Sequence, residues 1–362
     1  MNPLLPVILL LATNANISAF SYQQSTLAKR KRNTLNMATT ADSDAFSASP
    51  KRRGAKVAFV GNSIQYFNDT PRFLSTLSRQ TDPSGVNHHN PFIEHQDSCF
   101  RGGVSLVGLW EQGNGMLKHG FASKVAVTGT DEHGGNIDVG SSTVKNLLTQ
   151  KQWDFVVMND HTQHPARLES RGATIDILVR SYAPLLKANK ATPIIIETAA
   201  YRLEGIVGSA DLGPTEEFQA KVREGILCYL DALRKEIPQS NSPRLAPVGT
   251  AYLHVRELKF ELWEQLFDSF DNFHPSPKGT FFQGCVLYYT MFTCLPPIPS
   301  TTKEIAQLWN DARMMNCADR AKGYEVMPLP TVEEAKYFCE VAKLICEREV
   351  INQGAEQNKS CL

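Results

Sequence analysis

The stretch VAFVGNSIQYFNDTPRFL, residues 57–74, decides the fold. It begins with four apolar residues, Val57 to Val60, a composition typical of a buried parallel strand. Gly61 then turns the chain, and Ser63 follows at the tip of the turn. Open α/β sheets bind ligands at the carboxyl ends of such strands, where a serine could also stand as a nucleophile. Taken alone, Gly-Asn-Ser is more simply interpreted as a polar turn, so the rest of the chain must decide.

The remainder of the sequence alternates predicted strands and helices. Thr70 is expected to cap the helix after the turn, with Pro71 in its first turn. The predicted strands are 57–60, 91–100, 153–158, 193–201 and 244–252. Four predicted helices have both ends assigned, at 72–77, 171–188, 302–315 and 331–349, and three more are a helix that carries Leu106, Leu109 and Trp110, one that starts at Pro214 and one that starts at Ser276. Residues 120–140 suggest a hairpin. This order predicts a three-layer α/β/α fold with a doubly wound, five-stranded parallel sheet (flavodoxin-like), extended by extra C-terminal helices.

The composition is that of a soluble globular protein. Of the 362 residues, 42% are hydrophobic and 20% are charged, and there are 37 basic and 37 acidic residues. This balance gives no indication of a nucleic-acid partner. The eight cysteines contain no Cys-x-x-Cys pair, so no zinc site is expected, and disulfide pairing stays open. No run of eighteen apolar residues occurs, so the mature chain should not span a membrane.

Residues 1–55 are predicted to be a leader and a disordered linker. The apolar run 4–12 and the junction Ile17-Ser18-Ala19-Phe20 are typical of a secretory signal peptide. A basic, Ser/Thr-rich segment follows, and the combination resembles the two-part presequences of algae with secondary plastids. We therefore expect entry into the secretory route, with onward transport to a plastid. The alternative is an ordinary signal peptide followed by a basic linker. The destination would then be secretion or an endomembrane lumen.

Polar residues follow the predicted strands at their ends. Ser63 follows the first strand, Gly102-Gly103 the second and Asn159 the third, while Asp271 and His274 precede the helix from Ser276. A parallel sheet would bring the first three positions to one edge, and the long loop before Ser276 can add the last two. The Asp-x-x-His spacing alone is also compatible with a helix-capping turn.

Four blocks in this order resemble the SGNH hydrolase superfamily, also called the GDSL lipase/esterase family. They read Val-Gly-Asn-Ser, Arg-Gly-Gly-Val-Ser, Val-Met-Asn-Asp and Asp-Asn-Phe-His-Pro, and the resemblance covers roughly residues 56–295. It implies a hydrolase-like domain at 56–296. Residues 297–362 lie outside the resemblance, and their two helical patterns are interpreted as an appendage packed on the same domain. Two positions depart from the family pattern: Asn62 replaces the usual aspartate, and Val157 stands where the family has glycine.

The resemblance implies a serine hydrolase that needs no metal or organic cofactor. Ser63 would be the nucleophile, His274 the base and Asp271 the residue that orients the base. The Ser63 and Gly103 amides and the Asn159 side chain would form the oxyanion hole, with Gly102 as the alternative to Gly103. The expected substrate is a small-molecule or carbohydrate-linked ester with a short acyl or O-acetyl group, since no long apolar lid is visible. A non-catalytic binding module and a carbohydrate acyltransferase are the alternatives, and the oligomeric state stays open.

Three further patterns have competing interpretations. Asp160, His161 and His164 could suggest a metal pair, but their spacing is not diagnostic, and polar residues of a substrate pocket are the preferred interpretation. Asn68-Asp69-Thr70 is a glycosylation sequon. Large aromatic residues in the domain are interpreted as core residues rather than ligand platforms; they are Trp110, Tyr201 and Tyr252.

Overall fold

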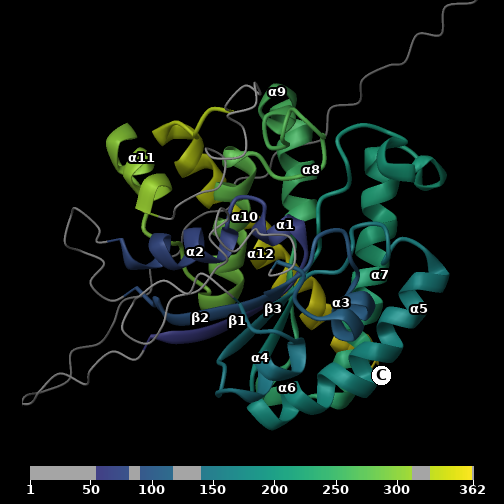
Figure 1. Ribbon diagram of the computed structural model, residues 1–362. Helices are drawn as coiled ribbons and strands as arrows, with labels where there is room; N and C mark the ends of the chain where they lie inside the picture. The colour runs from purple at the N-terminus through teal and green to yellow at the C-terminus, as the bar shows by residue number, and fades with distance from the viewer. Residues whose placement is uncertain (1–53, 81–89, 117–139, 312–326, 361–362) are drawn as a thin grey trace, which may run out of the picture. The chain divides into compact units, whose positions relative to one another are not determined.

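The computed structural model describes residues 54–80, 90–116, 140–311 and 327–360 (Figure 1). The predictions for the leader and the 120–140 hairpin lie almost entirely outside these residues. Within the described part of the chain, no helix is both long and apolar enough to cross a membrane.

The centre of the fold is a parallel sheet of five strands in the order β2-β1-β3-β4-β5. The strands are β1 Ala55–Gly61, β2 Ile93–Phe100, β3 Phe155–Met158, β4 Thr192–Ile196 and β5 Arg244–Ala246. This is the doubly wound, flavodoxin-like order, and it confirms the predicted fold class. The chain leaves β1 toward β2 on one side and later returns to β3 on the other, so the β1/β3 boundary is the topological switch point.

Helices cover both faces of the sheet, which makes three layers (Figure 1). Val57 and Phe59 belong to the core on one face, and Ala58 and Val60 to the core on the other, as the alternation of a strand requires. The first core includes residues of α2 Thr70–Arg79, α8 Val248–Leu258, α9 Phe260–Glu264, α10 Pro277–Phe292, α11 Thr302–Asp311 and α12 Val332–Ser360. The second includes residues of α3 Leu106–Gln112, α4 Val144–Thr149, η2 Leu178–Tyr182, α6 Ala183–Asn189 and α7 Thr215–Glu236.

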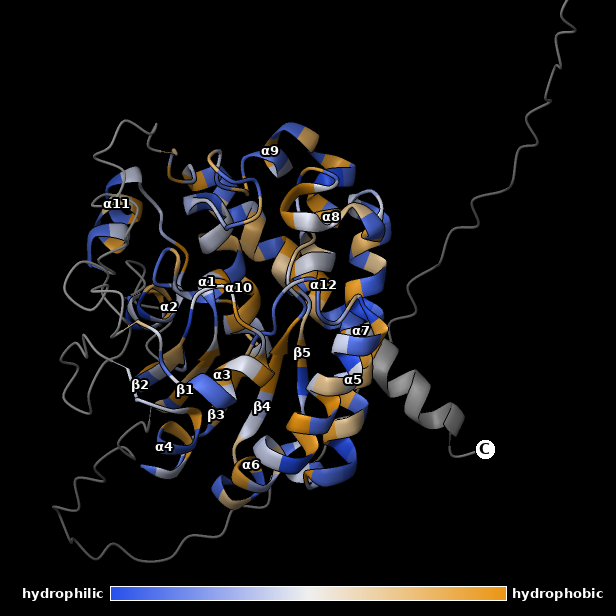
Figure 2. Cartoon of the chain, turned by 45° about the vertical axis from the view of Figure 1, so that its right-hand side comes forward, coloured by the Kyte–Doolittle hydropathy of each residue, from blue (hydrophilic) through white to orange (hydrophobic). Residues whose placement is uncertain are grey.

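Short helical turns complete the fold. They are α1 Ser63–Tyr66, η3 Ile206–Gly208, η4 Ala210–Leu212 and η5 Gln239–Asn241, and α5 Leu168–Ile177 runs into η2. Figure 2 shows the hydrophobic residues concentrated on the strands and on the helix faces turned toward them.

Two strands end earlier in the structure than the sequence predicted. The predicted strand 244–252 ends at Ala246, and α8 begins at Val248. Pro247 between them has no amide hydrogen for a ladder and a backbone φ suited to a helix start, which explains the change. The predicted strand 193–201 ends at Ile196, which pairs with the last residue of β5.

Two predictions about helices are wrong in detail. Asp69, not Thr70, caps α2: its carboxylate accepts from the Arg72 amide, and its φ of 46° is one that aspartate tolerates. The predicted helix 171–188 starts earlier, at Leu168, and contains a π-helical turn, Leu178–Tyr182, before α6. Pro184 in the first turn of α6 cannot donate an i→i−4 bond, which favours this irregularity.

The C-terminal helices are built into the first core. α12 packs along α10, and the buried residues of both helices belong to one cluster. A hydrogen-bonded network of arginine and glutamate side chains also joins α12 to the end of β4. Arg223 of α7 binds Glu197, which follows β4, at 2.9 Å and Glu349 of α12 at 2.6 Å.

Candidate active site

The first feature of the site is a pair of asparagines at the switch point. Asn62 follows β1 and Asn159 follows β3. The Asn159 Nδ2 donates to Asn62 Oδ1 at 2.8 Å, and the Asn62 backbone amide donates to Asn159 Oδ1 at 3.3 Å. A Cβ on Gly61 would overlap Asn159 Oδ1, so glycine is required there for this close approach.

Ser63 is the first residue of α1, the single helical turn after β1. Asn62 is the N-cap, and its Oδ1 accepts from the Ile64 amide at 3.2 Å. The turn places Ser63 at the carboxyl edge of a central strand. This is the position that the sequence predicted for it.

Gly103 lies in the loop after β2, close to the same edge. Its φ of +67° belongs to the left-handed region, which glycine adopts without strain. The next residue, Val104, accepts a hydrogen bond through its carbonyl from Asn62 Nδ2 at 3.0 Å. Asn62 therefore fixes the Gly103 loop as well as the helical turn that carries Ser63.

His274 and Asp271 form a close pair in the loop before α10. His274 Nδ1 and Asp271 Oδ2 are 2.6 Å apart, and Asp271 Oδ1 accepts from the backbone amides of Phe273 and His274. With Nδ1 donating to the carboxylate, Nε2 carries the lone pair and can accept a proton. Nε2 is buried and has no hydrogen-bond partner among the described residues, whereas most buried polar atoms in proteins have one.

The segment after Ser63 holds this histidine in place. The Phe67 ring stacks on the His274 imidazole, with ring centroids 4.2 Å apart and planes 2° from parallel. Asn68 Nδ2 donates to the Pro275 carbonyl at 2.7 Å and to Thr280 Oγ1 at 3.0 Å. Because Asn68 is fully buried and used in this way, its sequon is incompatible with glycosylation of the folded protein.

Ser63, Gly103 and His274 line a single cavity of about 290 Å³, which we call the site cavity. Its lining residues are Asn62, Ser63, Ile64, Tyr66, Gly103, His161, Thr162, Tyr201, Val207, Phe273 and His274. The structure therefore gathers the predicted nucleophile, base and second-block glycine, while Gly102 lies outside the lining. Asp271 also lies outside it and contacts the site through His274.

Asn159 stands one layer behind the cavity. Its side chain is fully buried, and its amide nitrogen donates to Asn62 Oδ1 and, at 3.1 Å, to the Asp160 carbonyl. Its oxygen accepts from Gln65 Nε2 at 2.7 Å. To donate a hydrogen bond to a substrate oxygen, the Asn159 Nδ2 would have to give up its bond to Asn62 or its bond to Asp160.

The charge states at the site follow from its surroundings. Burial acts to raise the pKa of Asp271, but hydrogen bonds from the His274 ring and two backbone amides outweigh it and lower the pKa below the usual value. Burial, together with the nearby His164, lowers the pKa of His161. Asp271 is therefore ionised near neutral pH, while His161 favours its neutral form.

Asp160 has a structural role that the sequence analysis did not predict. Its carboxylate accepts from the Leu106 and His161 amides and from the hydroxyls of Thr174 and Tyr229, at 2.8 to 2.9 Å. It does not line the site cavity, so the substrate-pocket interpretation is wrong for this residue. Within the described residues, no group of three or more side chains is arranged to hold a metal ion.

The lining also contains residues that the sequence analysis missed. Tyr201, interpreted as a core residue, is 3% exposed but lines the site cavity together with Thr162 and Val207. These residues come from the loops after β3 and β4. Parallel strands place the loops that follow them at one edge of the sheet. The position of these residues just after predicted strands is therefore the signal in the sequence that could have pointed to them.

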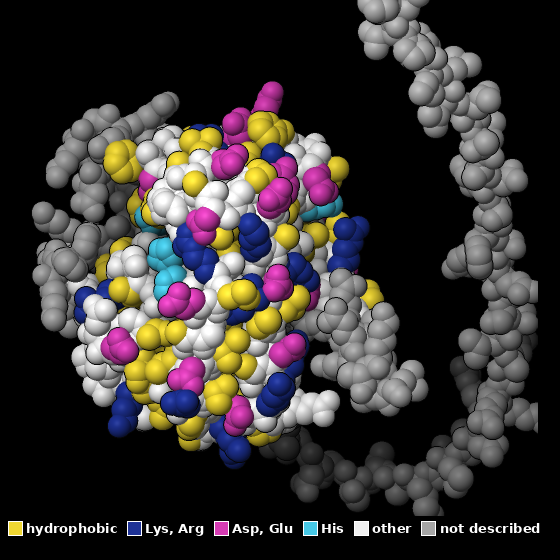
Figure 3. Space-filling model, turned by 90° about the vertical axis from the view of Figure 1, so that its right-hand side faces the viewer, with side chains coloured by type: hydrophobic (Ala, Val, Ile, Leu, Met, Phe, Trp, Pro, Cys, Tyr) yellow, Lys and Arg dark blue, Asp and Glu magenta, His cyan; other side chains and the backbone are white. Residues whose placement is uncertain are grey.

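The side of the molecule seen in Figure 3, at the right of Figure 1, intermixes positively and negatively charged side chains with hydrophobic ones. On this face no patch of a single charge sign is visible.

Several solved structures are similar to this chain. One is a candidate SGNH hydrolase from Slackia heliotrinireducens, with 20% identity and a TM-score of 0.41, covering 66% of this chain and 100% of that one. Another is a DUF4886 family protein from Bacteroides uniformis, with 17% identity and a TM-score of 0.49, covering 78% and 99%. A third is an α/β hydrolase from the metagenome of Lake Arreo, Spain, with 16% identity and a TM-score of 0.29, covering 66% and 95%. The sequence matches no family model and no curated protein.

Proposed function

We propose that this protein is a serine hydrolase that cleaves an ester through an acyl-serine intermediate. The observation that supports this most directly is the shared site cavity, in which Ser63 lies with a histidine whose Nδ1 binds a carboxylate and whose Nε2 has no described partner. A serine hydroxyl is a weak nucleophile without an adjacent base, and His274 is the residue that can provide one.

In the proposed reaction, Ser63 Oγ attacks the ester carbonyl carbon while its proton passes to His274 Nε2. The tetrahedral intermediate collapses, and the His274 imidazolium gives the proton to the leaving alcohol oxygen. Water then loses a proton to His274 and attacks the carbonyl carbon of the acyl-serine. As this second intermediate collapses, the bond from the carbon to Ser63 Oγ breaks, the His274 imidazolium returns the proton to Oγ, and the acid is released. Asp271 remains ionised throughout and stabilises the imidazolium. Ser63 and His274 share no described hydrogen bond, and such bonds often tighten only with substrate bound.

The oxyanion of the intermediate would be held by the backbone amides of Ser63 and Gly103. We propose the Asn159 amide as the third donor, with the bond to the Asp160 carbonyl, at 3.1 Å, as the one it would exchange. Asn62 supports all three groups, since it caps α1, binds Asn159 and binds Val104. Each donor of this kind typically contributes about 3 kcal/mol to transition-state stabilisation.

The site cavity favours a small acyl group. A volume of about 290 Å³ lies at the lower end of ordinary ligand pockets, and it must hold parts of both the acyl and alcohol groups. We therefore propose acetyl or another short acyl group on a small molecule or a carbohydrate.

The test is hydrolysis of short-chain esters by the purified protein and by Ser63→Ala. Ser240→Ala, at an exposed position in η5, is the matched serine control. We expect activity in the wild type and in Ser240→Ala, and none above background in Ser63→Ala. Equal turnover by all three proteins would refute the assignment of Ser63.

A further inference from the structure

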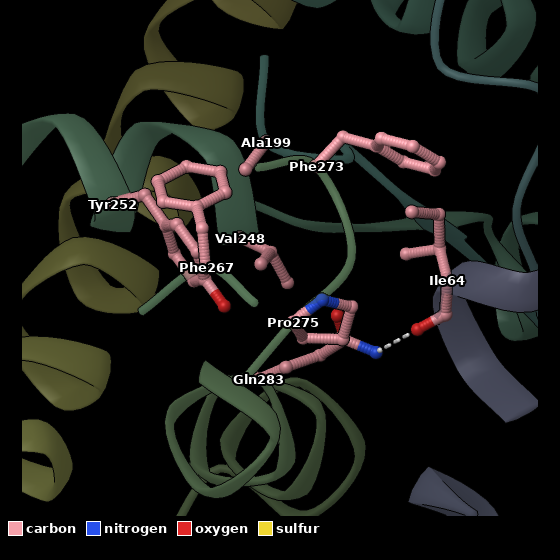
Figure 4. A pocket seen from close by; sticks show the side chains of 8 residues that line it. All are labelled: Ile64, Ala199, Val248, Tyr252, Phe267, Phe273, Pro275 and Gln283. Carbon is pink, nitrogen blue, oxygen red and sulfur yellow. Dashed lines mark hydrogen bonds between the residues drawn. The ribbon is translucent and has the colours of Figure 1, made fainter. Parts of the chain in front are cut away.

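A second, much smaller cavity shares two lining residues with the site cavity. Figure 4 shows the residues that line this second cavity. We call this second space the inner chamber. Its lining residues are Ile64, Ala199, Val248, Tyr252, Phe267, Phe273, Pro275 and Gln283. Ile64 and Phe273 line both spaces, so these two residues lie between them and form what we call the wall.

This wall lies beside the proposed reacting groups. Ile64 directly follows Ser63, and Phe273 directly precedes His274. An acyl group attached to Ser63 would therefore begin next to the wall, whichever way it extends. The volume of the inner chamber is about 10 Å³, room for about one water molecule, so an acyl chain cannot enter it in this state.

The chemistry of the inner chamber suits a hydrocarbon tail. Six of its eight lining residues carry hydrocarbon or phenyl side chains, and Tyr252 adds a further aromatic ring. The polar side chain of Gln283 is already hydrogen-bonded, because its Nε2 donates to the Ile64 carbonyl at 3.3 Å (Figure 4). The far side is packed into the core, because Tyr252 lies edge-on against Phe267 and stacks on Phe282.

The two halves of the wall differ in how firmly they are held. Ile64 is 8% exposed, its amide is bonded to the Asn62 cap, and its carbonyl is bonded to Gln283. The Phe273 side chain makes ring contacts with Tyr201 at 5.3 Å and His274 at 4.2 Å and packs against the second core, and no hydrogen bond among the described residues fixes it. Shortening Phe273 therefore removes wall volume without unpairing a side-chain hydrogen bond.

Building on the proposed function, we propose that Phe273, with Ile64, sets the acyl-chain limit of this site. The wall confines wild-type substrates to short acyl chains. The inner chamber is a latent site for a medium-chain acyl tail, and it becomes accessible when the phenyl ring of Phe273 is removed.

The experiment compares kcat/KM for p-nitrophenyl acetate, butyrate, hexanoate and octanoate in the wild type, Phe273→Leu and Phe273→Ala. We expect the wild type to favour acetate or butyrate. The octanoate-to-acetate ratio should rise by roughly tenfold or more in Phe273→Ala, since several methylenes gain an apolar pocket, with a smaller rise in Phe273→Leu. If the substitution also moves His274, the rates on all esters should fall together, and the octanoate-to-acetate ratio of kcat/KM is unaffected by such a general loss.

A refilling variant provides the control. Ala199 lines the inner chamber but not the site cavity, so Phe273→Ala/Ala199→Leu should return the ratio toward the wild-type value. An equal fall on every ester would make Phe273 a positioning residue for His274 and overturn the proposal. A wild type that already prefers octanoate, or a ratio insensitive to Ala199→Leu, would overturn it too.

Labelling by a fluorophosphonate probe separates this proposal from the proposed function. If wild type and variants are all labelled at Ser63 but the acyl profile is unchanged, only the role of the wall is refuted. If neither probe nor ester reacts with the wild type, the hydrolase assignment is refuted, and the acyl-chain limit with it.

Discussion

Asn62 and Asn159 hydrogen-bond to each other across the boundary between β1 and β3, side chain to side chain at 2.8 Å and backbone to side chain at 3.3 Å. The pair joins the turn that carries Ser63 to the end of the neighbouring strand. Since Asn62 also binds the Val104 carbonyl, loops from three strands depend on one side chain.

We expect Asn159→Ala to lower kcat by roughly 10²–10³, because it removes a proposed oxyanion donor. Asn62→Ala should also lower kcat, since it releases Asn159 and removes the α1 cap, which typically costs about 1 kcal/mol. Because the residues act together, the double variant should be little worse than the more damaging single variant. Steady-state kinetics on a short-chain ester measure all three.

Asn62→Asp is the matched control for this pair. A carboxylate can still accept from Ile64 and Asn159, but it cannot donate to the Val104 carbonyl and sets two acceptor oxygens beside each other, so its loss of kcat should be smaller than that of Asn62→Ala but measurable. If Asn159→Ala changed KM alone, Asn159 would be assigned to substrate binding. If Asn62→Asp were as damaging as Asn62→Ala, the bond to Val104 would be the important one.

Ser63 and His274 are expected to act as a unit. Ser63→Ala and His274→Ala should each reduce kcat to near background, and the double variant should be no slower than either, because each step requires both groups. Burst and steady-state kinetics on p-nitrophenyl acetate provide the measurement. Multiplicative losses would show instead that the two side chains contribute independently.

Glu197 should make the stability of the fold depend on pH. Burial raises its pKa to about 7, although Arg223, Thr250 and Gln219 all act to lower it. Between its ordinary value of 4.5 and about 7, the folded protein holds a proton that the unfolded chain has lost. The free energy of unfolding should therefore fall as pH rises through this window, by roughly 3 kcal/mol for this group.

Urea unfolding at pH 5, 6, 7 and 8 tests this expectation. Glu197→Gln should flatten the slope in this window, whereas Glu236→Gln, exposed near the end of α7, should leave it unchanged. A slope that persists in Glu197→Gln would assign the pH dependence to other groups.

The leader remains a prediction, and reporter fusions can test it. Residues 1–55 fused to a fluorescent protein should enter the secretory route and reach a plastid when expressed in an alga with secondary plastids. Phe20→Ala should stop the reporter in an earlier compartment, because such import often depends on an aromatic residue after the signal cleavage site. A reporter that stays in the cytosol with the intact leader would contradict both expectations.

The sequence predicted the sheet well because its strands carry strong local signals. The run from Val57 to Val60 is uninterrupted and ends at a glycine, so both its type and its end could be predicted. Ser63 and Asn159 could be placed at one edge because parallel strands share that edge, whereas His274 could be added only because the loop before α10 is long enough to reach it.

Errors arose where a local signal was ambiguous or the deciding contact was distant. Pro247 within the predicted fifth strand, and Asp69 beside Thr70, were local signals that were given too little importance. By contrast, the Asn68 bond to Pro275 joins residues 207 positions apart, and the Phe67–His274 stack is equally distant in the sequence. No periodicity or motif reports such contacts.

The central claim is that Ser63 is a nucleophile activated by His274, and one labelling experiment tests it most directly. The purified protein is treated with a fluorophosphonate probe near neutral pH, and the adduct is located by peptide mass spectrometry, with Ser63→Ala and His274→Ala treated in parallel. We predict a single adduct, on Ser63, that is absent from Ser63→Ala and strongly reduced in His274→Ala. No adduct on the folded wild type, or an adduct on another serine that persists in Ser63→Ala, would contradict the claim.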